Sequence, residues 1–149
     1  MPHQPDKPSH LQTASNVITA LAAVLALIVI PWQLREAERL QQAQSARDIY
    51  RDFLNLTVQK PEVATTDLCQ TTDPRARIAY EAYVDHLLYT AEQVLEVSAD
   101  WQAPMQAQIN RHRPYLCSWG ETDLADFSEP VGALLGATRQ GCSSTKACP

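Results

Sequence analysis

Glycine is scarce in this sequence, with only 4 residues among 149. Sandwiches and barrels depend on glycine in turns and on β-branched residues in strands, whereas this chain favours Ala, Leu, Gln, Glu and Arg. These residues are good helix formers. The composition therefore predicts an all-α protein.

Motifs for known chemistries are also missing. The sequence has no P-loop, Gly-x-Gly-x-x-Gly, Gly-x-Ser-x-Gly or His-Glu-x-x-His motif. A di-iron site needs Glu-x-x-His, but Val84, Leu95 and Ala99 stand where the histidines would follow Glu81, Glu92 and Glu96. We therefore expect no catalytic site, cofactor or metal ion.

An excess of positive charge is absent as well. The formal net charge is -5, and the acidic excess falls after residue 32. A nucleic-acid partner would require a basic surface, so this class of partner is disfavoured.

Charge is missing altogether between Lys7 and Arg35. Within this stretch, residues 13–32 would form a helix of about 30 Å, which matches the hydrocarbon thickness of a bilayer. We expect a transmembrane helix here, after an N-terminal tail at residues 1–12. The alternatives are a cleaved signal peptide, although no small-x-small site follows the apolar run, and a buried soluble helix.

Apolar residues at steps of three and four predict helices after the span. The first runs from the membrane to Pro61, residues 61–73 are expected to form a loop, and the second helix starts at Pro74 with Asp73 as its cap. Shorter helices are expected from Trp101 to His112, capped by Asp100, and from Ser128 to about residue 140. The predicted architecture is one membrane helix followed by a soluble bundle of three to four helices at residues 33–140, with a disordered tail at 141–149.

Two groups of residues near the membrane are candidate contact sites. One is a stripe of small residues on a single helix face, which lets another membrane helix approach closely: Ser15, Thr19, Ala22 and Ala26. The other is expected to meet lipid, with an interfacial aromatic and two cations beside anionic headgroups: Trp32, Arg35 and Arg39.

Acidic residues form a second candidate surface, on the helix that starts at Pro74. They recur at steps of four, seven and four: Glu81, Asp85, Glu92 and Glu96. Arginines recur similarly on the preceding helix, so antiparallel packing would bring Arg47 and Arg51 level with Glu81 and Asp85. The acidic row is either a solvated face or the binding site of a basic partner.

The four cysteines and the histidine beside Asp85 are weaker candidates for a functional role than the acidic row. Cys117 is expected to be a buried apolar residue, and His86 a structural side chain rather than half of a proton-carrying pair. Arg35, Arg39, Arg47 and Arg51 follow the span while only Lys7 precedes it, which predicts a cytoplasmic C-terminal domain with reduced thiols and an N-terminus outside. An oxidising compartment would instead allow Cys142–Cys148 and Cys69–Cys117 disulfides.

Three segments carry a resemblance to known proteins: "ARDIYRDFLNLTVQKPE", "YEAYVDHLLYTAEQVLE" and "HRPYLCS". With the single span they resemble small bacterial membrane-anchored proteins of unknown function that have a helical soluble domain. The resemblance implies an architecture and a bacterial inner membrane, but no activity.

These features together predict a non-enzymatic, single-pass membrane protein. Its helical domain would act as an accessory or scaffold subunit that binds another protein, or a second copy of itself, at the membrane. The alternative is a membrane-anchored thiol-based redox sensor or enzyme that uses Cys69, Cys117, Cys142 and Cys148.

Overall fold

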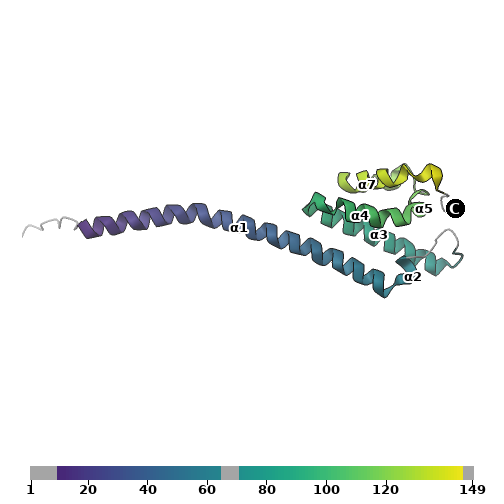
Figure 1. The fold of residues 1–149 in the computed structure, drawn as a ribbon, viewed down its shortest axis with the longest axis horizontal. Helices are drawn as coiled ribbons and strands as arrows, with labels where there is room; N and C mark the ends of the chain where they lie inside the picture. Colours follow the sequence, from purple (N-terminus) through teal and green to yellow (C-terminus); the bar gives the residue numbers. More distant parts are fainter. Residues whose placement is uncertain (1–9, 65–70, 146–149) are drawn as a thin grey trace, which may run out of the picture. The chain divides into compact units, whose positions relative to one another are not determined.

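The computed structural model describes residues 10–64 and 71–145, and side chains from Ala14 onward. Every regular element in these ranges is helical, so the predicted all-α class is confirmed (Figure 1). In chain order the elements are α1 (His10–Gln59), α2 (Pro61–Ala64), α3 (Pro74–Val97), η1 (Ala99–Trp101), α4 (Gln102–Ile109), η2 (Asn110–His112), α5 (Arg113–Leu116), α6 (Glu121–Leu124), α7 (Glu129–Arg139) and η3 (Cys142–Ser144).

The chain divides into two compact units, one ending at Gln41 and the other beginning at Gln42. Both contain part of α1, a single helix of 50 residues that continues through Pro31. The predicted tail at residues 1–12 lies mostly outside the described residues, and α1 already includes residues 10–12.

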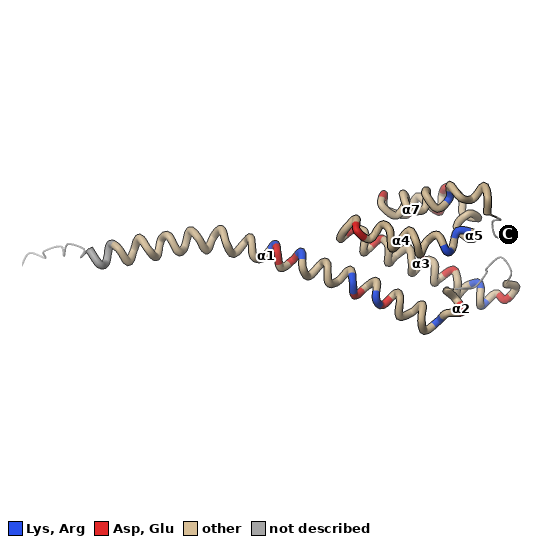
Figure 2. Tube along the Cα trace, viewed as in Figure 1, with Lys and Arg blue, Asp and Glu red and all other residues tan. Residues whose placement is uncertain are grey.

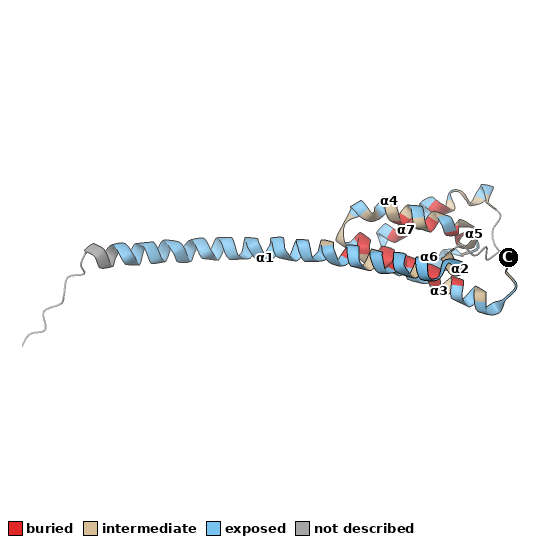
Figure 3. Ribbon diagram, turned by 60° about the horizontal axis from the view of Figure 1, so that its bottom comes forward, coloured by how far each residue is buried: buried red, intermediate tan, exposed pale blue. Residues whose placement is uncertain are grey.

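In the first unit the described residues form one stretch of helix, and none of its described side chains is buried. Every described side chain from Ala14 to Gln41 is exposed, and acidic or basic residues appear only from Arg35 onward (Figures 2 and 3). Among the described residues, α1 is the one helix long and apolar enough to cross a membrane. Because none of its apolar window is buried, the alternative of a buried soluble helix is disfavoured.

The second unit is built around α3. Its N-terminus follows the prediction: Pro74 occupies the first turn, and the Asp73 carboxylate accepts a hydrogen bond of 3.0 Å from the Arg75 amide. One face of α3 is buried and packs against α4 and α7. The buried side chains of α3 are Tyr80, Tyr83, Val84, Leu87, Leu88, Thr90, Ala91, Val94 and Leu95.

The end of α1 joins this core. Ala46 and Phe53 are completely buried, and the Phe53 ring lies 5.6 Å from that of Tyr83. The Thr57 and Tyr83 hydroxyls are hydrogen-bonded at 2.9 Å. Because Ala43 and Val97 also line one hollow, the two helices run antiparallel within this unit, as the sequence predicts.

Two local predictions are wrong. Asp100 does not cap the following helix, because the Ser98 hydroxyl accepts from the Asp100 amide at 3.2 Å and opens the turn η1 instead. Residues 61–64 form α2 where a loop is expected, since Lys60 O accepts the amides of Val63 and Ala64.

The last helix starts as predicted, with Ser128 as the N-cap of α7. The segment after it differs from the predicted disordered tail: Cys142–Ser144 forms the turn η3, and Cys142 is bonded to Cys117. Residues 146–149 lie outside the described residues.

Candidate functional site

A hollow between α3 and the start of α7 contains two of the predicted partner-binding residues. Its volume is about 470 Å³. Side chains spaced three and four residues apart form its α3 wall, so they share one exposed helix face. The lining residues are Tyr89, Glu92, Gln93, Glu96, Ser128 and Pro130. We call this hollow the α3–α7 groove.

Glu92 fixes the geometry of the α3–α7 groove. Its Oε1 accepts a hydrogen bond of 2.8 Å from the backbone amide of Ser128, the N-cap of α7. The Ser128 side chain makes no capping bond, so the Glu92 carboxylate takes over part of that role. A carboxylate is favoured at this place because the N-terminus of a helix carries partial positive charge.

The mouth of the groove is acidic and aromatic. Glu96 is exposed, and the Tyr89 side chain is 60% exposed. Within the described part of the chain, no Lys, Arg or His forms an ion pair with Glu92 or Glu96. The groove can therefore accept a cationic group, held by two carboxylates and by the face of a tyrosine ring.

The other two predicted acidic residues lie elsewhere on α3. Glu81 pairs with Arg77 at 3.1 Å within the helix, and Asp85 is exposed. Burial, and secondarily the charge of Glu81, raises the pKa of the Asp85 carboxyl. The structure thus separates the acidic row into a groove pair, Glu92 and Glu96, and a pair nearer the start of α3.

The predicted ion pairs between α1 and α3 do not form. Arg51 pairs with Asp48 at 3.1 Å, one turn away in its own helix, and Glu81 pairs with Arg77. The helix register explains the difference: Phe53 packs against Tyr83 and His86, which places Arg51 farther along α3 than Glu81 and Asp85.

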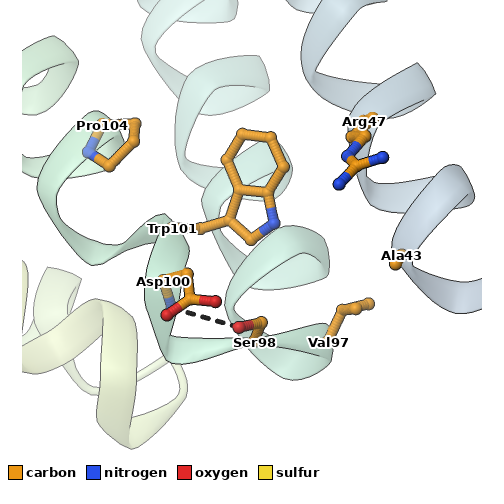
Figure 4. A pocket seen from close by; sticks show the side chains of 7 residues that line it. All are labelled: Ala43, Arg47, Val97, Ser98, Asp100, Trp101 and Pro104. Carbon is orange, nitrogen blue, oxygen red and sulfur yellow. Dashed lines mark hydrogen bonds between the residues drawn. The ribbon is translucent and has the colours of Figure 1, made fainter. Parts of the chain in front are cut away.

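A second hollow, of about 300 Å³, lies between α1 and the turn after α3 (Figure 4). The Trp101 ring and the Arg47 side chain stand on two of its sides, and Asp100 lies in its floor beside Ser98. Trp101 also packs against Tyr50 of α1, with ring centroids 5.1 Å apart. This ring fills space between helices, so we assign the hollow to packing.

The titratable residues of the core form an aromatic cluster. The Tyr80 hydroxyl and His112 Nδ1 are 2.9 Å apart in a buried hydrogen bond, and the Tyr83 and Tyr115 rings lie nearby. Burial, with a smaller effect of Arg111, lowers the pKa of His112 to about 4. Burial raises the pKa of the Tyr115 hydroxyl, and Glu81 and Asp85 add to this effect. His112 is therefore a neutral structural residue.

The predictions for His86 and Cys117 compare differently with the structure. The His86 ring lies 6.1 Å from Phe53, consistent with the predicted structural position. Cys117 is half-buried and forms a disulfide with Cys142, so the prediction of a buried apolar thiol is wrong, as are the alternative pairings Cys142–Cys148 and Cys69–Cys117. Cys69 and Cys148 themselves lie outside the described residues.

The predicted membrane residues are all exposed. The Thr19 hydroxyl donates to the Ser15 carbonyl at 2.9 Å, so its polarity is satisfied within the helix. Trp32 is 67% exposed, and Arg39 lies 3.8 Å from Glu36. These positions remain accessible to lipid or to another helix.

Sequence reasoning missed four groove residues: Tyr89, Gln93, Ser128 and Pro130. An exposed tyrosine between acidic residues on α3 was the available signal for the first. The contribution of α7 had no such signal, because it depends on how α7 packs against α3. No family model, curated protein or solved structure matches this chain.

Proposed function

We propose that this protein is a non-enzymatic, single-pass membrane protein whose helical domain binds another protein through the α3–α7 groove. The α1 helix would cross the membrane at residues 13–32, and α3, α4, α7 and the end of α1 would form the main helices of the binding domain. Trp32 would lie at the interface, with Arg35 and Arg39 beside anionic headgroups.

The observation that supports this proposal most directly is the composition of the groove. Tyr89 is exposed beside Glu92 and Glu96, two carboxylates without an ion-pair partner among the described side chains. Tyrosine is enriched in protein interfaces, where its ring supplies contact area at a small entropic cost. A partner segment with arginine or lysine beside an apolar residue is complementary to such a surface.

Site-specific photo-crosslinking tests the proposal. A photoreactive amino acid at Gln93 would lie in the groove, whereas one at Ala82, about three turns earlier on the same face of α3, would not. We expect a crosslinked product from position 93, formed with a basic segment of the partner and lost when Glu96→Lys is added. The control at Ala82 should give none.

Other outcomes would contradict this proposal. Identical products from both positions, or a product insensitive to Glu96→Lys, would show that the groove is not the binding surface. A product formed only between two copies of this chain would indicate self-association and not binding to a basic partner.

The alternative of a thiol-based redox protein depends on the disulfide Cys117–Cys142. Replacing all four cysteines by serine separates the two functions, because an adaptor does not need thiol chemistry. Recovery of the crosslinked product from the cysteine-free chain would remove the redox function, whereas its loss from a folded variant would favour it.

The orientation of the domain across the membrane does not depend on the groove. The arginines after the span predict a cytoplasmic domain and an N-terminus outside. The disulfide opposes this orientation, because disulfides are rare in the cytosol. The groove proposal holds in either orientation.

A further inference from the structure

Polar contacts join the run α4–η2–α5 to α7 along one line. The buried Thr138 hydroxyl accepts from Gln106 Nε2 at 2.8 Å and lies 3.0 Å from Asn110 Oδ1. Gln106 Nε2 also lies 3.2 Å from the Leu134 carbonyl. We call these contacts, together with those that continue to the Cys117–Cys142 disulfide, the polar seam.

Arg113 extends the polar seam by one turn. Its Nη2 donates to Asn110 Oδ1 at 3.3 Å. The guanidinium lies so close to Gly141 that a Cβ there would approach Nη1 to 2.8 Å and Cζ to 2.9 Å. Glycine at position 141 therefore leaves the space that Arg113 occupies.

The disulfide closes the seam at its end. Cys117 lies one turn after Arg113, and its amide donates to the Arg113 carbonyl. Cys142 directly follows Gly141, and the two cysteine Cα atoms are 5.6 Å apart, within the ordinary range for a disulfide. Asn110 with Thr138 and Arg113 with Gly141 share one register, and the Cys117–Cys142 disulfide follows directly after Gly141. The fold itself therefore holds this cysteine pair together.

The charge rule for orientation is weaker than the sequence alone suggests. Arg47 and Arg51 belong to the compact unit that begins at Gln42. The rule applies to short flanking segments, because folded domains are translocated largely regardless of their charge. The flanks then hold Lys7 before the span against Arg35 and Arg39 after it, an excess of a single charge.

We infer that the domain at residues 42–149 faces an oxidising compartment, which for a bacterial inner membrane is the periplasm, and that Cys117–Cys142 is closed in the mature protein. Disulfides persist in such compartments and are reduced in the cytosol. The inference reverses the orientation predicted from charge and does not depend on the groove.

Formation of the Cys117–Cys142 disulfide requires an oxidant. A thiol–disulfide oxidoreductase in its disulfide form is the class of oxidant that can supply this reaction. The thiolate of one cysteine attacks the oxidant's disulfide and displaces one of its thiols, which gives a mixed disulfide. The other cysteine then attacks this intermediate and releases the second thiol. Two protons and two electrons thus pass to the oxidant, which leaves as a dithiol.

Maleimide labelling of spheroplasts tests orientation and disulfide together. The full chain would carry Cys69→Ser, Cys148→Ser and a reporter cysteine, Ala107→Cys, at an exposed position of α4. With a membrane-impermeant maleimide of high mass, we expect one shift in intact spheroplasts. Two further shifts should appear only after reduction in denaturant. A cytosolic thiol protein that stays unlabelled serves as the control for membrane integrity.

Two results would overturn the inference. Labelling of the reporter only after lysis would place the domain in the cytoplasm. Reaction of all three thiols without reduction would show that the disulfide is not formed. A second measurement avoids dependence on the cysteine variants: alkaline phosphatase fused after residue 149 of the wild-type chain should be active, and its inactivity at normal expression would contradict export.

Discussion

At the scale of single residues, the buried pair of Tyr80 and His112 shows how the core constrains charge. The His112 side chain is 3% exposed among aromatic rings, and its pKa falls to about 4. In the unfolded chain the same imidazole would titrate near its ordinary value of about 6.5. Between these two values the unfolded state binds the extra proton, so the folded state loses stability as the pH falls.

This difference predicts the pH dependence of unfolding. Stability contributed by neutral His112 should be complete above about pH 6.5 and lost progressively toward pH 4, by up to about 3 kcal/mol. Urea unfolding of the full chain in detergent at pH 7 and pH 4.5 measures it. His112→Gln should show a smaller loss than the wild type, whereas the exposed control His86→Gln should keep the full loss. Equal losses in all three chains would contradict the assignment.

At the scale of helices, α1 has two different roles along one continuous element. Its side chains from Ala14 to Gln41 are exposed, whereas from Ala46 onward it supplies side chains to the core. The same apolar spacing of three and four continues through both parts. The part after Gln41 belongs to the second compact unit, where the Phe53 and Tyr50 rings pack against other aromatic rings.

This role predicts different effects for two neighbouring side chains of α1. Phe53→Ala removes a completely buried ring and should lower the free energy of unfolding by about 3–5 kcal/mol. Leu54→Ala, at a position 37% exposed, should change it by less than about 1 kcal/mol. Chemical denaturation of both full-length variants is the measurement. Similar values would show that the end of α1 is not part of the core.

Local signals in the sequence were sufficient to predict several helices. Asp73–Pro74 fixed the start of α3 because the cap and the first-turn proline act within one turn. The antiparallel packing of α1 and α3 also followed from their order. The register did not, because it depends on how Phe53 and Tyr83 fit together, and the predicted pairing of Arg47 and Arg51 with Glu81 and Asp85 failed for that reason.

The candidate site was predictable only in part for the same reason. Glu92 and Glu96 belong to one periodic row, so the sequence shows them together. The groove depends on the packing of α7 against α3, where the Ser128 amide donates to Glu92. The polar seam and the partner of Cys117 likewise depend on contacts between helices, for which spacing along one helix carries no information.

At the scale of the whole molecule, every proposed role depends on α1 as a membrane anchor. An apolar helical segment that is exposed from Ala14 to Gln41 is unfavourable in water, because each CH₂ group that is buried contributes about 0.8 kcal/mol. A bilayer would supply that burial. In the proposed function, anchoring would also keep the domain near membrane partners and so raise their effective concentration.

Alkaline carbonate extraction of membranes that contain the full chain tests this anchoring most directly. High pH strips peripheral proteins but leaves a helix that spans the hydrocarbon core. We predict that the chain stays in the pellet at its full length, and that Leu25→Arg with Ile28→Arg releases it, since charges at the centre of a span are costly. Recovery of the unaltered chain in the supernatant, or of a product that starts near residue 31, would contradict the membrane anchor.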